Sequence, residues 1–136
     1  CDAKVHYIQI NYNCQFESML IVDEAKIKQV LINLIQNAAD ALVGIEEPTI
    51  SITLKEENGF VCIQIDDNGV GIPFELQRKI FDLMFTTKGD KGLGLGLDIS
   101  KQIMKDHEGI LDCTSSYGVG TTFKMLFPSA DERAHS

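Results

Sequence analysis

The sequence has no pair of cysteines with Cys-x-x-Cys spacing and no apolar run long enough to cross a membrane. Its four cysteines, Cys1, Cys14, Cys62 and Cys113, are far apart in the chain. We therefore expect reduced structural thiols in a cytoplasmic protein, rather than a disulfide framework. A signal peptide is also absent, and the abrupt start at Cys1 leads us to expect a segment of a longer protein.

Basic residues are few, since 12 Lys and Arg stand against 20 Asp and Glu, for a net charge of −8. This balance argues against a broad nucleic-acid surface and against direct contact with an anionic membrane. Half of the basic residues nevertheless lie in the glycine-rich stretch between Leu76 and Lys105, which suits a small anionic ligand. At 136 residues the chain can form one domain, expected over 1–128, with a polar tail at 129–136.

Apolar residues alternate with polar ones in several short runs, which predict strands. The predicted strands span residues 5–11, 19–22, 49–55, 60–66, 110–114 and 121–127. The predicted strands 49–55 and 60–66 are joined by a segment that ends in Asn58-Gly59. This dipeptide between two strands is a strong hairpin signal.

Between the strands, apolar residues recur at steps of three and four, which predicts a long helix after Asp23. Asp23 can cap that helix, and Gly44 and Pro48 end it. Shorter helices are predicted at 73–80 and from Gly94 to Gly109. We therefore expect an α/β two-layer sandwich, with a mixed, mostly antiparallel five-stranded sheet covered on one face by three helices.

Asp67 directly follows the strand predicted at 60–66 and is thereby placed at the end of a sheet. Gly69 and Gly71 let the backbone turn sharply and let a flat group approach, because neither has a Cβ atom. A buried carboxylate beside bare backbone suits recognition of an exocyclic amine such as N6 of adenine. The alternative is a tight turn with a solvated Asp67.

Three alternating glycines, Gly92, Gly94 and Gly96, lie where a predicted loop enters a helix. Their backbone N–H groups and the positive end of the helix dipole predict a phosphate cradle, flanked by Lys88 and Lys91. The spacing fits neither a P-loop nor the dinucleotide fingerprint. The alternatives are a plain hinge and ordinary solvated lysines.

These elements resemble, in their order, the ATP-binding domain of sensor histidine kinases, in the superfamily shared with DNA gyrase and a heat-shock chaperone. The stretches 33–39, 67–71, 80–88 and 92–96 look like that family's N, G1, F and G2 boxes, and 118–121 looks like its terminal Gly-x-Gly-Thr. The resemblance covers about Asp23 to Pro128. It implies the Bergerat ATP-binding fold, with ATP and Mg²⁺ as ligands.

The resemblance also implies a role for each motif residue. Asn37 would offer its carbonyl oxygen to Mg²⁺, and Asn37 and Lys88 would serve the phosphoryl transfer. Asp67 would accept a hydrogen bond from adenine N6, with Thr121 nearby. The other implied nucleotide contacts are Asn33, Gly69, Gly71, Ile72, Phe81, Phe85, Thr86, Thr87, Lys91, Gly92, Leu93, Gly94, Leu95 and Gly96. Of these, Phe81 and Phe85 would anchor a lid over the triphosphate, although either could belong to the core.

Two features depart from the family pattern, and a third position, Asn33, bears on ATP hydrolysis. Leu83-Met84 stands where Pro-Phe is frequent, so the packing of the lid would differ. Asp40 occupies a position that is often basic, and we leave open whether it binds the metal through water or only faces solvent. Asn33 replaces the Glu of the gyrase and chaperone branches and is a poor base, so we expect little ATP hydrolysis.

The implied activity is a protein-histidine kinase of two-component signal transduction, with a response regulator downstream. None of the histidines, His6, His107 and His135, lies on a long amphipathic helix beside an acidic residue. We therefore expect the phosphate-accepting histidine on a separate helical dimerisation domain. Two alternatives remain. One is a serine-directed relative such as an anti-sigma-factor kinase, and the other is a non-catalytic nucleotide-binding module.

Overall fold

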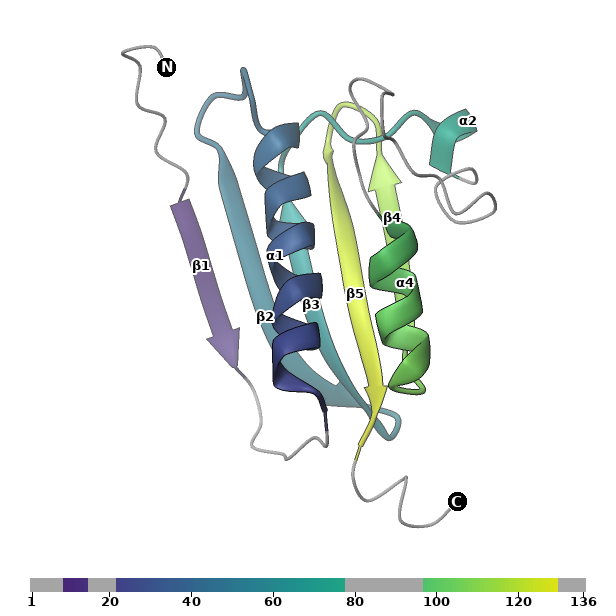
Figure 1. The fold of residues 1–136 in the computed structure, drawn as a ribbon. Helices are drawn as coiled ribbons and strands as arrows, with labels where there is room; N and C mark the ends of the chain where they lie inside the picture. The colour runs from purple at the N-terminus through teal and green to yellow at the C-terminus, as the bar shows by residue number, and fades with distance from the viewer. Residues whose placement is uncertain (1–8, 15–21, 78–96, 130–136) are drawn as a thin grey trace.

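The computed structural model describes residues 9–14, 22–77 and 97–129 (Figure 1). Its elements are β1 (Gln9–Cys14), α1 (Glu24–Ala41), β2 (Thr49–Glu57), β3 (Phe60–Asp67), α2 (Phe74–Gln77), α4 (Leu97–Asp106), β4 (Ile110–Ser116) and β5 (Gly120–Pro128). Residues 5–8 of the strand predicted at 5–11 lie outside the described residues, and residues 9–11 are in β1, which continues to Cys14. Of the strand predicted at 19–22, only Val22 is described, and it is not in a strand.

The sheet has the strand order β1-β2-β3-β5-β4. The neighbours from β2 to β4 pair antiparallel, whereas β1 pairs in parallel with β2 at one edge. The α/β sandwich and the mixed, mostly antiparallel pairing are therefore as predicted. The described sheet has five strands, of which β2, β3, β5 and β4 form an antiparallel part of four strands, and β1 adds to its edge in parallel.

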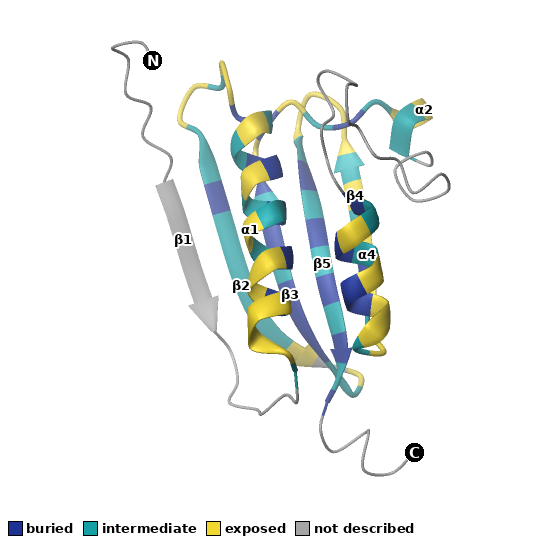
Figure 2. Cartoon of the chain, in the orientation of Figure 1, coloured by how far each residue is buried: buried dark blue, intermediate teal, exposed yellow. Residues whose placement is uncertain are grey.

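Helix α1 forms because its N-terminus is capped and its apolar residues share one face. The Oδ1 of Asp23 accepts a hydrogen bond from the backbone N–H of Lys26 at 3.3 Å. The residues buried along the helix, together with Leu42 just after it, keep the predicted three- and four-residue spacing and face the sheet (Figure 2): Ile27, Val30, Leu34, Asn37, Ala38 and Leu42. The helix prediction is thus confirmed.

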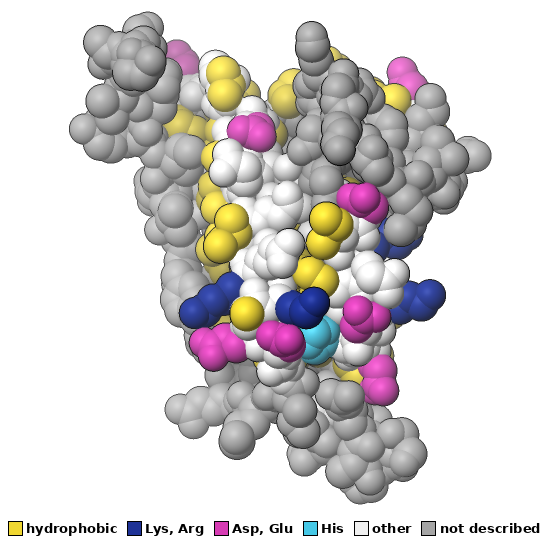
Figure 3. Space-filling model, in the orientation of Figure 1, with side chains coloured by type: hydrophobic (Ala, Val, Ile, Leu, Met, Phe, Trp, Pro, Cys, Tyr) yellow, Lys and Arg dark blue, Asp and Glu magenta, His cyan; other side chains and the backbone are white. Residues whose placement is uncertain are grey.

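Two of the described helices, α1 and α4, cover one face of the sheet (Figure 1). The third, α2, is a four-residue turn without a buried residue, and it lies against β4 at the end of the sheet. The prediction of three helices on one face is therefore wrong for the described residues, and residues 78–80 of the predicted helix 73–80 lie outside them. Scattered hydrophobic side chains lie on the outer surface of the helix layer (Figure 3), and Ile32 and Ile99 are among the exposed ones.

Side-chain hydrogen bonds join α1 to α4 at two levels. Near the middle, Nδ2 of Asn33 donates to Oγ of Ser100 at 3.1 Å. At the start of α1, the backbone N–H of Asp23 donates to Nε2 of His107 at 3.0 Å, and Nδ1 of His107 lies 2.8 Å from the carbonyl of Ile103. Both ring nitrogens are thereby satisfied in the neutral Nδ1–H tautomer.

The turns show where local signals hold and where they do not. Asn58 and Gly59 have φ of 56° and 81°, the pair of positive values that a type I′ hairpin requires, so that prediction is confirmed. At the end of α4, the left-handed residue is Glu108, with φ of 61°, rather than Gly109. Gly109 is needed for space, because a Cβ atom there would lie 2.5 Å from the carbonyl oxygen of Leu126.

The core fills the space between the helices and the sheet. Along β5, every second residue is buried, from Thr121 through Phe123 and Met125 to Phe127 (Figure 2). Ile63 and Ile65 of β3 pair with Met125 and Phe123 in register and face the same side. None of the described helices is both long and apolar enough to cross a membrane.

Leu34→Ala tests the packing of α1, since Leu34 is fully buried against the sheet. We expect a loss of about 2–5 kcal/mol in the free energy of unfolding, because the lost methyl groups leave a cavity. The matched control is Ile32→Ala on the same helix, where the side chain is 66% exposed and the expected change is within about 0.5 kcal/mol. Urea denaturation measures both, and similar losses for the two variants would contradict this packing.

Candidate functional site

Asp67 is the last residue of β3, held between Ile50 on β2 and Thr121 on β5 by the strand register. Its side chain is only 9% exposed. Oδ1 accepts a hydrogen bond from the backbone N–H of Gly69 at 2.8 Å, and the carboxylate also accepts one from the backbone N–H of Thr121. The buried carboxylate is therefore as predicted, and the alternative of a solvated Asp67 is excluded, because the carboxylate is buried and accepts hydrogen bonds from backbone donors.

Burial raises the pKa of Asp67 above the usual value for a carboxyl group. The backbone N–H groups of Gly69 and Thr121 oppose this shift, and the charge of Asp66 adds to it. A carboxylate with poor hydration gains more than an exposed one from a new hydrogen-bond donor. A ligand that brings a donor, such as an exocyclic amine, therefore suits this position.

The glycines after Asp67 are required chiefly by neighbouring chain segments. Gly71 has φ of 80°, so the predicted sharp turn is confirmed there. A Cβ atom on Gly71 would clash with the backbone of Ser116, and one on Gly69 would lie 2.5 Å from the carbonyl oxygen of Ala41. The absent side chains thus let the segment pack between α1 and the β4–β5 turn.

Backbone hydrogen bonds fix the same segment on both sides. The N–H of Val70 donates to the carbonyl of Ala41 at 3.1 Å, and the N–H of Gly118 donates to the carbonyl of Val70 at 2.6 Å. The loop after β3 therefore connects the end of α1 to the β4–β5 turn. Its position changes little unless one of those elements moves.

Ser115 is a site residue that the sequence analysis missed. Its Oγ accepts from the backbone N–H of Ile72 at 2.8 Å, lies 3.0 Å from the carbonyl of Gly120 and 2.8 Å from Oγ1 of Thr121. One hydroxyl thus connects Ile72 and Thr121, which the sequence analysis had named, with Gly120 beside them. The sequence feature that could have pointed to Ser115 is its place in the strand pattern, because residues 111, 113 and 115 share the more buried face of β4.

A pocket of about 310 Å³ opens at this end of the sheet. Its lining is rich in side-chain hydroxyls and includes the buried carboxylate: Asp67, Asn68, Thr114, Ser115, Ser116, Val119, Gly120, Thr121 and Thr122. Ile72, which is 6% exposed, borders the same region through its bond to Ser115. Hydroxyls and a carboxylate around a small hollow offer both donors and acceptors to a ligand.

Helix α1 supplies the other predicted side chains of the described part. Asn37 is buried, at 7% exposure, on the sheet-facing side. Asn33, one turn earlier, donates to Ser100 and so faces α4. Asp40 is exposed and accepts a hydrogen bond from Nε2 of Gln36 at 3.4 Å, which places it on the solvent side of the helix.

The residues present fit a magnesium ion only as part of a nucleotide complex. Within 22–77 and 97–129, no group of three or more His, Cys, Asp or Glu residues could hold a metal ion. An amide oxygen such as that of Asn37 is a hard donor of the kind Mg²⁺ accepts. Mg²⁺ commonly takes one or two protein ligands and completes its shell with water and phosphate oxygens.

Several predicted contacts fall outside the described residues: Phe81, Phe85, Thr86, Thr87, Lys88, Lys91, Gly92, Leu93, Gly94, Leu95 and Gly96. The predictions for the lid and the phosphate cradle therefore stay predictions. Neither Cys62 nor Cys113 is in a disulfide with another described residue. Burial raises the pKa of Cys113 to about 12, with smaller contributions from Asp112 and Asp67, so this thiol is protonated and a poor nucleophile.

Comparison with known proteins identifies the family of this chain. The family model for histidine kinase-, DNA gyrase B- and HSP90-like ATPases matches residues 22–131. The chain belongs to this family.

Among its relatives and structural neighbours are histidine kinases. The signal transduction histidine-protein kinase AtoS of Escherichia coli K12 is 40% identical over 111 residues, which are 82% of this chain and 18% of AtoS. The chain thus spans less than a fifth of that relative's length.

Solved structures agree with this assignment of the fold. The nucleotide-free catalytic domain of histidine kinase ThkA superposes with a TM-score of 0.74 at 36% identity, over 89% of this chain and 80% of that one. A structure of ThkA in complex with the response regulator protein TrrA gives 0.71 at 33% identity, over 93% of this chain and 35% of that one. The resemblance to histidine kinase catalytic domains is therefore confirmed.

Asp67→Asn tests the electrostatics of the buried carboxylate through the dependence of stability on pH. Because the folded-state pKa is raised, protonation of Asp67 favours the fold, and that contribution is lost as pH rises through the raised value. The neutral variant should therefore resist urea better than the parent near neutral pH, and the difference should vanish below the ordinary pKa of a carboxyl group.

The matched control is Asp112→Asn, which changes an exposed carboxylate on β4 and should show no such trend. Unfolding midpoints between acidic and neutral pH measure both variants. A parent that is more stable than Asp67→Asn at neutral pH would show that the charged form is favoured instead.

Proposed function

We propose that this domain binds Mg·ATP and donates the γ-phosphate to a histidine on a separate helical dimerisation domain. The proposal depends above all on Asp67, a buried carboxylate at the end of β3 whose raised pKa reflects poor hydration. Family membership implies an ATPase-type nucleotide site, and this carboxylate is where a purine amine would be recognised.

The adenine end of the site would be formed by β3, β5 and the loop between them. Asp67 would accept a hydrogen bond from adenine N6, and Thr121 would lie next to the base, since the two residues pair across the strands. Ile72 is held by Ser115 and would pack along the ring together with Gly71. The orientation of the Thr121 hydroxyl is coupled to Ser115, because their oxygens lie within hydrogen-bond distance.

The phosphate end would combine α1 with the predicted lid and cradle. Asn37 would coordinate Mg²⁺, which screens the negative charge of the phosphates when bound. We keep Lys88, Lys91 and the glycines from Gly92 to Gly96 as proposed phosphate contacts, and Phe81 with Phe85 as proposed anchors of the lid. Phosphoryl transfer depends mainly on positioning and charge stabilisation, which these groups can supply.

Transfer to a protein acceptor is favoured over hydrolysis by the character of Asn33. An amide has no basic site that could activate water at neutral pH. Its Nδ2 also donates to Ser100, which orients the side chain toward α4. We therefore propose a phosphoryl donor with little intrinsic ATP hydrolysis, in contrast to a water-attacking ATPase.

The proposed partners are the helical dimerisation domain of the same parent protein and a response regulator. The complex of ThkA with its response regulator TrrA supports the second partner by analogy. A cytoplasmic location follows from the proposed use of ATP. A serine-directed kinase would differ in the acid stability of its phosphoryl product, and a non-catalytic module would bind nucleotide without transfer.

Calorimetric titration of ATP, with Mg²⁺ and with chelator, tests the adenine assignment. Asp67→Asn should lower ATP affinity by about tenfold or more, because a hydrogen bond to a charged group contributes about 1.5–3 kcal/mol. The control is Asp66→Asn, whose carboxylate is bound by Thr122 and Gln64 on the opposite face of β3. Equal affinities for the parent and Asp67→Asn would refute the assignment.

Phosphotransfer in trans tests the proposed reaction. The isolated chain with γ-labelled ATP should acquire no label, since its described histidine, His107, serves the α1–α4 contact. Addition of the helical domain from the parent protein should give an acid-labile phosphohistidine on that domain. Labelling of the chain alone, or acid-stable label on the partner, would contradict the proposal.

A further inference from the structure

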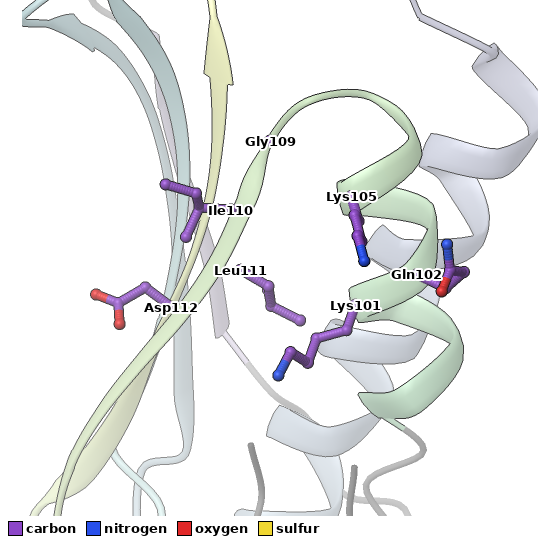
Figure 4. A pocket seen from close by; sticks show the side chains of 7 residues that line it. All are labelled: Lys101, Gln102, Lys105, Gly109, Ile110, Leu111 and Asp112. Carbon is purple, nitrogen blue, oxygen red and sulfur yellow. The ribbon is translucent and has the colours of Figure 1, made fainter. Parts of the chain in front are cut away.

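A second pocket, of about 560 Å³, lies between α4 and β4 and shares no lining residue with the pocket beside Asp67. Lys101 and Lys105 extend from α4 toward the strand, and the side chain of Leu111 points from β4 into the space between them (Figure 4). Asp112 is the one carboxylate among the lining residues, and it points to the opposite side of the strand. The pocket therefore combines two lysine side chains with the apolar side chain of Leu111.

The backbone of β4 adds hydrogen-bonding groups to this pocket. β4 is an edge strand in the described sheet. The carbonyl of Ser115 accepts a hydrogen bond from Nε2 of Gln77 at 3.0 Å, so it faces away from β5. In an antiparallel strand, alternate residues direct their N–H and C=O groups to the same side, so those of Leu111 and Cys113 also face away from β5.

We propose that this edge binds an extended acidic segment of a partner protein, which adds to the sheet beside β4. Its backbone would pair with Leu111 and Cys113, as an exposed edge allows, while its carboxylates would meet Lys101 and Lys105. The two lysines lie one helical turn apart, a rise of about 6 Å. Alternate residues of a strand are about 6.7 Å apart, so an acidic-x-acidic pattern matches that spacing.

The edge favours an extended polypeptide over a small polyanion. A phosphate or carboxylate ion only accepts hydrogen bonds, whereas Leu111 and Cys113 each present one donor and one acceptor in a line along the strand. Towards the other end of β4, Gln77 and α2 cover the same side, so among the described residues the uncovered stretch is limited to the part beside the lysines. Charge complementarity selects an acidic occupant, although the chain itself is acidic at −8.

The first test measures charge recognition with a fluorescein-labelled peptide, Thr-Glu-Val-Glu-Thr, by anisotropy against the full chain at low salt. Lys101→Glu/Lys105→Glu should weaken binding about fivefold to tenfold, because two attractions become repulsions. The matched control, Lys26→Glu/Lys28→Glu, makes the same charge change on exposed positions of α1 and should have little effect. Circular dichroism checks that both variants are folded.

The second test separates strand addition from simple anion binding. Two versions of the peptide, N-methylated on alternate residues, remove the donors on one side of the strand or on the other. One version should lose binding and the other should retain it, and the parent peptide should slow hydrogen exchange at Leu111 and Cys113. Equal binding of both methylated peptides, no binding of the parent peptide, or binding that ignores both lysines would each overturn the proposal.

Discussion

The structure depends on how a carboxylate is kept at the buried end of β3. Burying a charged group is costly unless donors replace the lost water, and here those donors are the backbone N–H groups of Gly69 and Thr121. One donor is placed locally, by the turn directly after β3, and the other is placed by a strand that is distant in sequence, through β3–β5 pairing. Their bonds only partly offset the cost, since the pKa of Asp67 is still raised.

The part of the cost of burying the Asp67 charge that the backbone donors do not offset links the fold with the proposed recognition of a ligand. An under-hydrated acceptor gains more from a new donor than a solvated one does, so part of the energy spent in folding is recovered on binding. The neighbouring loop cannot move away to hydrate the carboxylate, because Val70 is bonded to both α1 and the β4–β5 turn. The part of the proposed site around Asp67 would therefore need little rearrangement on binding, which reduces its ordering cost.

Local features of the sequence were sufficient to predict the framework. Asn58-Gly59 and the cap at Asp23 depend on residues within one turn, and their conformations follow from their own chemistry. The role of Ser115 and the reason for Gly69 depend on contacts with segments 28–43 residues away along the chain, such as Ala41 and Ile72. No local pattern encodes those contacts, so the sequence analysis singled out Asp67 but missed the Ser115 hydroxyl that is hydrogen-bonded beside it.

At the end of α4, a local sequence signal is overridden by a contact with a segment that is distant in the chain. A glycine after a helix normally predicts the left-handed residue, yet Glu108 takes that conformation and Gly109 makes room for the carbonyl of Leu126. The turn is closed by the hydrogen bond from the N–H of Gly109 to the carbonyl of Met104, and His107 beside it joins α4 to the first turn of α1. Together with the bond from Asn33 to Ser100, this contact holds the helix that carries Asn37 against α4. The helix layer thus sets the position of Asn37, and the loop after Asp67 is hydrogen-bonded to Ala41 at the end of the same helix. A nucleotide that spans Asp67 and Asn37 would therefore meet two groups whose relative position is set by the fold.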